Sequence, residues 1–272
     1  MIQDSDEKEN GYLFDHTSNE ERVRLTSLAA ELDLGTFRYL DALGVGEGWT
    51  CLEVGAGTGS VARWLAERVG GSGRVLATDL DTRYLDSAGY PNLEVRRHDV
   101  LRNDLPAGQF DVVHVRWVLC WLPSPQEGLE RLVRTLRPGG WVLAEEPDFV
   151  TARHSSPAGV YSNVGMATLR VMESMSALNC EYGRRLFDDL RGQPLIEVRA
   201  EGRAPMVSGG QPLAGAEFIR VTIERLRSAI VAAGEVTDEE VEHAIALLRD
   251  PSFTTIFPIT MAAWGQRAPT GE

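Results

Sequence analysis

The stretch that decides the fold is Leu52-Glu53-Val54-Gly55-Ala56-Gly57-Thr58-Gly59-Ser60. A short apolar run over 50–54 predicts a buried strand, and the residues after Gly59 predict a helix. Glycines between a strand and a helix let the backbone turn tightly and approach a ligand closely. The first N–H groups of the helix have no partner inside it and can face that ligand. A plain tight turn is the alternative, but three alternating glycines exceed what a turn needs.

The spacing of these glycines differs from the dinucleotide-binding fingerprint. That fingerprint reads Gly-x-Gly-x-x-Gly and seats a pyrophosphate on the helix N-terminus. Here Gly59 comes one residue early, and Ser60 stands where the third glycine is expected. Glu53, two residues before the first glycine, would repel a pyrophosphate. Its charge suits a ligand that carries a cationic amine and a sulfonium.

Strands and helices alternate around this loop. Apolar periodicity predicts helices over 20–43 and from Val61 to Val69. The expected strands lie at 50–54, 74–78, 93–97, 110–115 and 141–144. Ser124-Pro125-Gln126-Glu127 predicts a capping box for a further helix, which Pro138-Gly139-Gly140 is expected to end. This rhythm predicts a parallel, doubly wound α/β sheet with right-handed crossovers.

The alternation changes after Glu146. We expect helices over 157–191 and 214–233, a helix headed by a capping box at Thr237–Glu240, and strands over 195–207 and 254–264. These two strands bring the mostly parallel sheet to seven. The expected organisation is an N-terminal lid and helical segment over 1–43, a ligand-binding core over 44–150, and cap helices with C-terminal strands over 151–272 that complete the same domain.

Composition limits the classes of function. The chain has 272 residues and a net charge of −13, which would repel a nucleic acid in the absence of a basic stripe. No apolar run approaches the roughly 20 residues of a membrane span, and the polar, acidic segment 1–9 does not resemble a signal or transit peptide. The three cysteines are far apart and form neither a metal-binding pair nor a disulfide framework. We therefore expect a cytoplasmic protein without a bound metal.

The ordered landmarks resemble a known family. Glu53-x-Gly55-x-Gly57-x-Gly59 is similar to motif I of the class I S-adenosylmethionine-dependent methyltransferases, which have a Rossmann-like sheet. The stretches 74–79, 97–100, 110–116 and 136–140 are similar to the later landmarks of that family. The resemblance is strong over about residues 50–146 and covers the rest only by general architecture. It implies S-adenosyl-L-methionine as the cofactor.

The resemblance also implies which residues bind the cofactor. Asp79 would accept both ribose hydroxyls, Asp99 the adenine amino group, and the backbone N–H of Val100 would meet a ring nitrogen. Arg116 would contribute mainly through its backbone, at the methionine end. A cap or turn role is the alternative for Asp79 and Asp99. The expected cofactor-binding residues are Glu53, Gly55, Gly57, Gly59, Asp79, Leu80, Asp99, Val100 and Arg116.

A general base is harder to assign. Glu146 lies at the end of the fifth strand, where ligands bind in open sheets, and either a base or a helix cap fits it. Glu145 cannot face the same side of the strand. His154 follows in a loop and is the second candidate, with a surface histidine as its alternative. His114, inside the apolar fourth strand, is interpreted as a hydrogen-bonded core residue.

These observations predict an enzyme that transfers a methyl group to an oxygen, nitrogen or carbon of a small organic molecule. The cap helices would serve substrate recognition or a homodimer contact. Family members with similar caps suggest a substrate from secondary metabolism. An NAD(P)-dependent oxidoreductase is one alternative, which the glycine spacing disfavours. A non-catalytic or repurposed cofactor-binding member is the other, because the base is weakly defined.

Overall fold

The computed structural model describes residues 13–14, 18–149 and 159–269. Its contacts divide the chain into two compact units. The sheet unit comprises Leu32–Glu146, Tyr182–Gly202 and Met261–Glu272, and the helical unit comprises Met1–Glu31, Pro147–Glu181 and Arg203–Thr260. The long helix α1 (Asn19–Ala42) contributes residues to both units.

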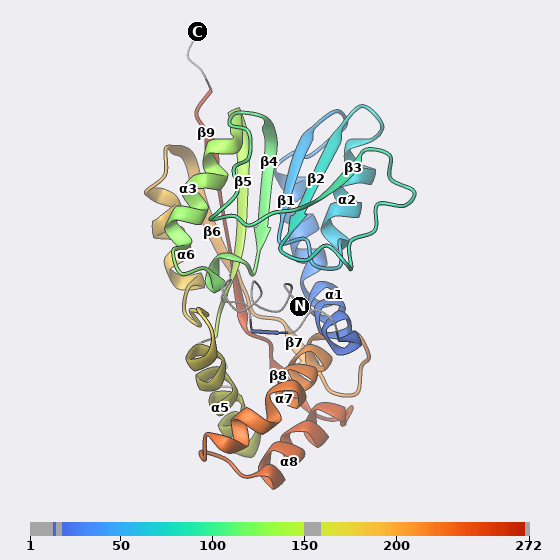
Figure 1. Ribbon diagram of the computed structural model, residues 1–272, viewed down its shortest axis with the longest axis vertical. Helices are drawn as coiled ribbons and strands as arrows, with labels where there is room; N and C mark the ends of the chain where they lie inside the picture. The colour runs from blue at the N-terminus through green and yellow to red at the C-terminus, as the bar shows by residue number, and fades with distance from the viewer. Residues whose placement is uncertain (1–12, 15–17, 150–158, 270–272) are drawn as a thin grey trace, which may run out of the picture. The chain divides into compact units, whose positions relative to one another are not determined.

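Seven strands form the main sheet, in the order β3-β2-β1-β4-β5-β9-β6 (Figure 1). Neighbouring strands from β3 to β5 pair in parallel, so their carboxyl ends meet at one edge. The order of the strands reverses between β1 and β4, and ligands of open α/β sheets bind at such a switch point. The strands are β1 (Thr50–Val54), β2 (Arg74–Asp79), β3 (Leu93–Arg97), β4 (Phe110–Arg116), β5 (Leu136–Asp148), β6 (Leu195–Arg203) and β9 (Ile259–Arg267). The predicted doubly wound, seven-stranded Rossmann-like sheet is confirmed.

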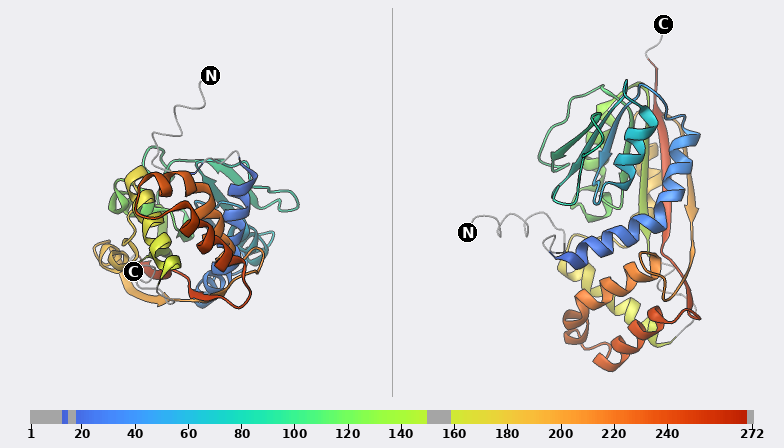
Figure 2. Two further views of the ribbon diagram at one scale, coloured as in Figure 1. Left: turned by 90° about the horizontal axis from the view of Figure 1, so that it is seen from below. Right: turned by 90° about the vertical axis from the view of Figure 1, so that its right-hand side faces the viewer.

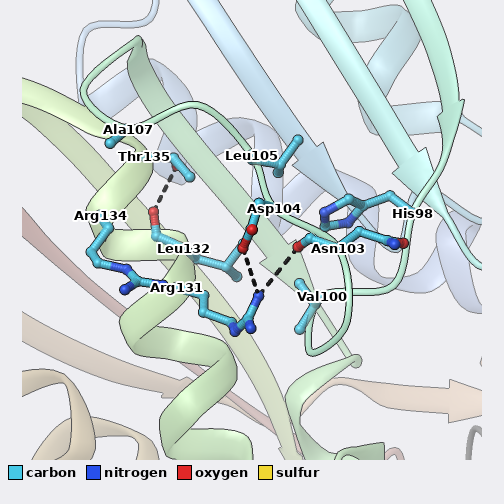
Figure 3. A pocket seen from close by; sticks show the side chains of 10 residues that line it. All are labelled: His98, Val100, Asn103, Asp104, Leu105, Ala107, Arg131, Leu132, Arg134 and Thr135. Carbon is cyan, nitrogen blue, oxygen red and sulfur yellow. Dashed lines mark hydrogen bonds and ion pairs between the residues drawn. The ribbon is translucent and has the colours of Figure 1, made fainter.

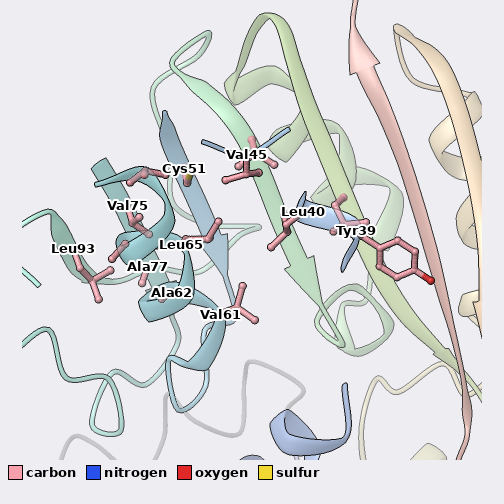
Figure 4. Close-up of a cluster of buried hydrophobic side chains, with 14 of the residues drawn as sticks. Tyr39, Leu40, Val45, Cys51, Val61, Ala62, Leu65, Val75, Ala77 and Leu93 are labelled. Atoms are coloured by element: carbon pink, nitrogen blue, oxygen red, sulfur yellow. The ribbon is translucent and has the colours of Figure 1, made fainter. Parts of the chain in front are cut away.

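The core of the sheet unit lies between β1, β2 and the helices beside them. The amphipathic helix α2 (Ser60–Val69) buries Val61, Leu65 and Val69, as its apolar spacing predicts. Figure 4 shows Val61 and Leu65 beside side chains of the strands and of the second half of α1. The other helices of this unit are η2 (Leu119–Trp121), α3 (Pro125–Thr135) and α6 (Gly183–Arg191). The apolar core therefore includes residues of β1 and α2, the two elements that flank the glycine loop.

The helical unit contains α5 (Val160–Met175), α7 (Gly215–Ala232) and α8 (Asp238–Arg249), which pack against one another (Figure 2). The predicted capping box at α8 is confirmed: Thr237 and Glu240 exchange hydrogen bonds between side chain and backbone. A separate two-stranded sheet, β7 (Met206–Ser208) with β8 (Thr254–Ile256), belongs to this unit. No helix among the described residues combines the length and apolar character needed to cross a bilayer.

Two predicted strands are each divided in the structure, and a proline lies at each division. The strand expected over 195–207 divides into β6 and β7 before Pro205, and the strand expected over 254–264 divides into β8 and β9 before Ile259, next to Pro258. Proline lacks the N–H that a continuous ladder needs. The range 157–191 was expected to be mostly helical, and its described residues form the two helices α5 and α6.

The turn from α3 into β5 also differs from expectation. The Ser124 side chain makes no capping hydrogen bond, so the predicted capping box is absent, although Pro125 does occupy the first turn. The helix ends at Thr135, and Leu136 already pairs with Phe110 of β4. Pro138-Gly139-Gly140 therefore lies within the first part of β5 and does not end the helix. Because Leu136 pairs with β4, β5 begins at Leu136, five residues before the strand that the local sequence predicts from Trp141.

Candidate cofactor site and active site

The glycine loop between β1 and α2 adopts a left-handed backbone at all three glycines. The φ angles of Gly55, Gly57 and Gly59 are 68°, 55° and 78°. The N–H groups of Gly55 and Ala56 both donate to the Thr78 carbonyl, which fixes the loop to β2. A Cβ at Gly55 would lie 2.1 Å from a methyl carbon of Val118, whereas one at Gly57 would meet nothing within 4 Å. The loop is tight at Gly55 and open at Gly57, where a ligand can approach the backbone.

Acidic side chains lie at or next to the last residue of the first two strands and follow the third. Asp79 accepts a hydrogen bond from the Gly57 N–H at 2.8 Å and another from the Asp81 N–H at 3.1 Å. Asp99 accepts one from the Leu101 N–H at 2.9 Å and is half-buried. Because β1, β2 and β3 are parallel neighbours, Glu53, Asp79 and Asp99 stand along the same edge of the sheet. Leu80 is half-buried and Val100 buried, directly after two of these acids.

Glu53 is bonded to a histidine on the neighbouring strand. The register of β1 and β4 places Glu53 opposite His114, and a Glu53 oxygen lies 2.6 Å from His114 Nδ1. The other ring nitrogen, Nε2, lies 3.0 Å from an oxygen of Glu145 on β5. All three side chains are buried, and His114 is 0% exposed. The prediction of a hydrogen-bonded core histidine is confirmed, but its two carboxylate partners were missed.

The contacts continue from Glu145 to α1 and back to the glycine loop. Thr36 donates to the same Glu145 oxygen at 2.6 Å and accepts from Arg116 at 2.7 Å. Arg116 also donates to Asp33 at 2.9 Å, and Asp33 accepts from Ser60, the first residue of α2, at 3.0 Å. The side chain of Arg116, expected to act mainly through its backbone, thus ties β4 to α1. We call Glu53, His114, Glu145, Thr36, Arg116, Asp33 and Ser60 the polar chain.

The end of β4 turns sharply beside this chain. Trp117 has a φ of 56°, which is uncommon for a bulky residue, and its N–H donates to the Glu145 carbonyl. Non-glycine residues with such a backbone cluster at functional sites. Val118 follows and packs against Gly55. The turn therefore lies next to the glycine loop, at the strand end where the methionine part of the cofactor was expected.

Glu146 points to the other face of β5. Its carboxylate accepts hydrogen bonds from the N–H groups of Val118, Leu119 and Cys120, at 2.8 to 3.1 Å. The side chain is 0% exposed, and burial raises the pKa of its carboxyl to about 7. The sequence left two roles open for Glu146, a general base or a helix cap. Three hydrogen bonds from successive backbone N–H groups are the geometry of a cap. His154, the second candidate base, lies outside the described residues.

A pocket of about 260 Å³ opens between the segment after β3 and helix α3 (Figure 3). His98 lines it, and among the described residues neither buried ring nitrogen has a hydrogen-bond partner. Burial lowers the pKa of His98 below its usual value. Of the predicted cofactor-binding residues, only Val100 lines this pocket. The complete lining is His98, Val100, Asn103, Asp104, Leu105, Ala107, Arg131, Leu132, Arg134 and Thr135.

Comparison with known proteins agrees with this geometry. A family model described as a methyltransferase domain matches residues 52–144, which run from β1 through most of β5. The SAM-dependent methyltransferase of Aquifex aeolicus superposes with a TM-score of 0.51 over 94% of this chain and all of that one, at 17% identity. The chain therefore contains a stretch that matches a methyltransferase domain, on a fold that it shares with S-adenosylmethionine-dependent methyltransferases.

Two proteins are similar to this chain in sequence. Methyltransferase str3 of Strobilurus tenacellus is 35% identical over 126 residues, 43% of this chain and 44% of that protein. The ubiquinone/menaquinone biosynthesis C-methyltransferase UbiE of Pseudomonas fluorescens is 26% identical over 201 residues, 71% of this chain and 74% of that protein. The match to the Strobilurus protein thus spans less than half of its length.

The residues of the site fit S-adenosyl-L-methionine, the cofactor named for the proteins that share this fold. The left-handed backbone at Gly57 leaves open space on the side where a Cβ would stand. The acids at the same sheet edge, Glu53, Asp79 and Asp99, provide acceptors for an amine, for hydroxyls and for an amino group. Among the described residues, no three His, Cys, Asp or Glu side chains are grouped to hold a metal ion.

Proposed function

We propose that this methyltransferase transfers a methyl group from S-adenosyl-L-methionine to an oxygen, nitrogen or carbon of a small organic molecule. The observation that carries the proposal is the open glycine loop with acids at the ends of three adjacent strands. The cofactor supplies a methyl group that its sulfonium already activates. What the chain must provide is a bound, aligned acceptor, and alignment alone can contribute roughly 7–11 kcal/mol of the barrier.

In this proposal each binding residue has a distinct task. Glu53 faces the cationic methionine end, Asp79 the ribose and Asp99 with Val100 the adenine. Asp79 has a second task, since its bond from the Gly57 N–H holds the loop in shape. Gly55, Gly59, Leu80 and the backbone of Arg116 would complete the contact surface.

Glu146 and His154 are the proposed residues that could accept a proton from the substrate. Glu146 has a pKa raised to about 7, which is suitable for a base at neutral pH, but three N–H groups already occupy its oxygens. That occupation favours acceptors that need little base assistance, such as an amine or an activated carbon. Because no free base is assigned, a protein that binds the cofactor without catalysing transfer is the second candidate function. His154 is the other proposed base.

The nature of the acceptor is proposed from the relatives and from the sequence. The name of the Pseudomonas relative makes a ring carbon of a quinone-type molecule one candidate acceptor. A secondary metabolite is the other class that we propose. The same proposal places the enzyme in the cytoplasm, without nucleic-acid or membrane partners, and allows a homodimer.

Calorimetric titration with S-adenosylhomocysteine, NAD⁺ and NADP⁺ tests the binding proposal. We expect heat from the first ligand only, and a loss of its affinity of roughly tenfold or more in Asp79→Asn, because a hydrogen bond to a charged group contributes about 1.5–3 kcal/mol. Asp81→Asn is the matched control, since Asp81 lies two residues away and does not contact Gly57 through its side chain. Binding of NAD⁺ or NADP⁺ alone would refute the proposal.

Transfer is tested separately from binding. The enzyme is incubated with methyl-labelled S-adenosylmethionine and a small-molecule extract, and labelled products are sought by mass spectrometry. A labelled small molecule is the expected result. Tight cofactor binding with label reaching no product would instead support the non-catalytic candidate.

A further inference from the structure

The pocket between α3 and the segment after β3, which we call the His98 pocket, is distinct from the proposed cofactor site. His98 and Val100 line it, whereas Asp99, between them in the chain, does not. The Asp99 carboxylate, proposed to meet the adenine, accepts a hydrogen bond from the Leu101 N–H. The pocket has a volume of about 260 Å³ and therefore offers space for a second ligand.

His98 is the buried polar group of this pocket. It is 6% exposed, and among the described residues neither of its ring nitrogens has a hydrogen-bond partner. Buried polar groups in folded proteins almost always have one, so an exception calls for a partner from outside the chain. Burial lowers the pKa of His98 and outweighs the opposing effects of the Asn103 backbone and the Asp99 charge. The ring is therefore neutral near pH 7, with one N–H that can donate and one lone pair that can accept.

Two arginines of α3 bring positive charge to the same pocket. Arg131 and Arg134 are three residues apart and so lie on one side of the helix (Figure 3). The contacts of Arg131 with Asp104 and Glu127 are 3.3 Å each, longer than the roughly 2.7–2.9 Å of a strong charged hydrogen bond. Arg134 is exposed and forms no ion pair within the described part of the chain. Two positive charges thus oppose the single negative charge of Asp104 in the lining.

The remaining wall is largely apolar. Val100 and Leu132 are buried, Leu105 is half-buried, and Ala107 contributes only a methyl group. The volume lies just below the roughly 300–1,000 Å³ of pockets that hold drug-sized ligands, so the occupant is smaller than such a ligand. A rigid ring fills an apolar space of this kind with less loss of conformational entropy than a flexible chain does.

We propose that the His98 pocket binds a small aromatic acid that carries a hydroxyl group. The carboxylate pairs with the guanidinium groups of Arg131 and Arg134, the ring packs against the apolar wall, and the hydroxyl forms a hydrogen bond with His98. No covalent bond forms or breaks. The inference goes beyond the proposed function, because none of these contacts involves the cofactor.

Ordered water is the competing occupant of the pocket. Water can satisfy the ring nitrogens of His98, as it does for many buried polar groups. It gains nothing from an apolar wall, however, and it does not balance the excess positive charge of the two arginines. The combination of apolar wall, neutral imidazole and guanidinium groups therefore favours an organic anion over water.

Calorimetric titration of the complete chain with three related probes tests the proposal. The probes are 4-hydroxyphenylacetate, phenylacetate, which lacks the hydroxyl, and 4-hydroxyphenylacetamide, which lacks the charge. We expect the first to bind most tightly. The amide should bind roughly tenfold or more weakly, because it loses a hydrogen bond between charged groups, and phenylacetate roughly two- to tenfold more weakly, because it loses a neutral one. Binding of none of the probes at millimolar concentration, or equal binding of all three, would overturn the inference.

Variants assign each part of the probe to its residue. Arg131→Gln combined with Arg134→Gln should abolish the preference for the acid over the amide, and His98→Phe the preference for the hydroxylated acid over phenylacetate. Arg68→Gln is the matched control, since Arg68 lies on α2, pairs with Asp41 at the surface and does not line the pocket. Its three affinities should equal those of the wild type. Preferences that persist in the pocket variants would contradict the proposed contacts.

Nuclear magnetic resonance of the wild type locates the bound probe without depending on a folded variant. With ¹⁵N-labelled histidine, 4-hydroxyphenylacetate should shift the ring signals of His98 and leave those of His243, an exposed residue of α8, unchanged. Binding that leaves the His98 signals unchanged would place the probe elsewhere and overturn the inference.

Discussion

At the scale of single residues, the site depends on Gly55, which has no side chain, and on Trp117, whose backbone is strained. Gly55 has a left-handed backbone, and Val118 occupies the space that a Cβ would need. Trp117, just before Val118, also has a positive φ. The close approach of Val118 to Gly55 joins the first and fourth strands at their carboxyl ends. This contact brings the glycine loop and the β4 turn together.

Gly55→Ala should destabilise the fold by about 2–4 kcal/mol, because it adds the cost of a left-handed backbone to overpacking against Val118. Chemical denaturation measures this loss. Gly57→Ala is the control, since its φ is similar but a Cβ there meets nothing within 4 Å. It should lose only about 1–2 kcal/mol. Equal losses in the two variants would show that packing at Gly55 is unimportant.

At the scale of elements, buried side chains hold the turns that end the strands. Glu146 of β5 accepts from three consecutive N–H groups of the segment Val118–Cys120, which leads into η2. Thr237 gives α8 a conventional capping box, which local sequence alone predicts. The Glu146 cap joins residues far apart in the chain and requires the pairing of β4 with β5.

Glu146→Gln should lower the free energy of unfolding by about 1–3 kcal/mol, because an amide NH₂ cannot accept and leaves a buried N–H without a partner. Urea denaturation above pH 7 measures the loss while the native carboxyl is ionised. Glu94→Gln is the matched control, since Glu94 is exposed and its carboxylate pairs with Arg96 on the surface. Its effect should stay within about 0.5 kcal/mol. An equally small effect in Glu146→Gln would contradict the cap.

The elements also show what sequence can and cannot predict. The bounds predicted for β1 and β3 agree with the structure to the residue. In β1 the apolar composition matches the burial of the strand, whereas β3 is mostly exposed. The start of β5 was missed because pairing with Phe110 outweighs the local turn signal of Pro138-Gly139-Gly140. The acids at the sheet edge could be predicted, since each follows or ends a recognisable strand.

The polar chain could not be predicted in the same way. His114 meets Glu53 and Glu145 only because three strands pair in one register, and no local pattern encodes that register. Thr36 and Asp33 come from α1, whose periodicity predicts a helix but not its neighbours. The position of His114 within an apolar strand did indicate a hydrogen-bonded core residue. It did not indicate which residues form those hydrogen bonds.

At the scale of the whole molecule, buried titratable groups make stability depend on pH. The pKa of His114 is raised from 6.5 to about 9, so its contribution is fully present below pH 6.5 and is lost as pH rises through about 9. Glu146 acts in the same direction at lower pH, since its pKa is raised from 4.5 to about 7. His98 acts in the opposite direction below its usual pKa, because its own pKa is lowered. The window from pH 7 to 9 therefore reports mainly on His114.

We expect the free energy of unfolding of the wild type to fall by about 3 kcal/mol between pH 6.5 and 9, since each pKa unit corresponds to about 1.4 kcal/mol. Denaturation at a series of pH values measures the decline. His114→Gln should show a flat profile over this window, even if its stability is lower throughout. A wild-type profile that stays flat or rises would contradict the raised pKa of His114.

The most direct test of the central claim is a crystal structure of the complete chain with S-adenosylhomocysteine. The account predicts that the nucleoside lies against Gly57, with Asp79 at the ribose, Asp99 at the adenine and Glu53 at the amine. A nucleoside bound elsewhere, or acids turned away from it, would contradict the account.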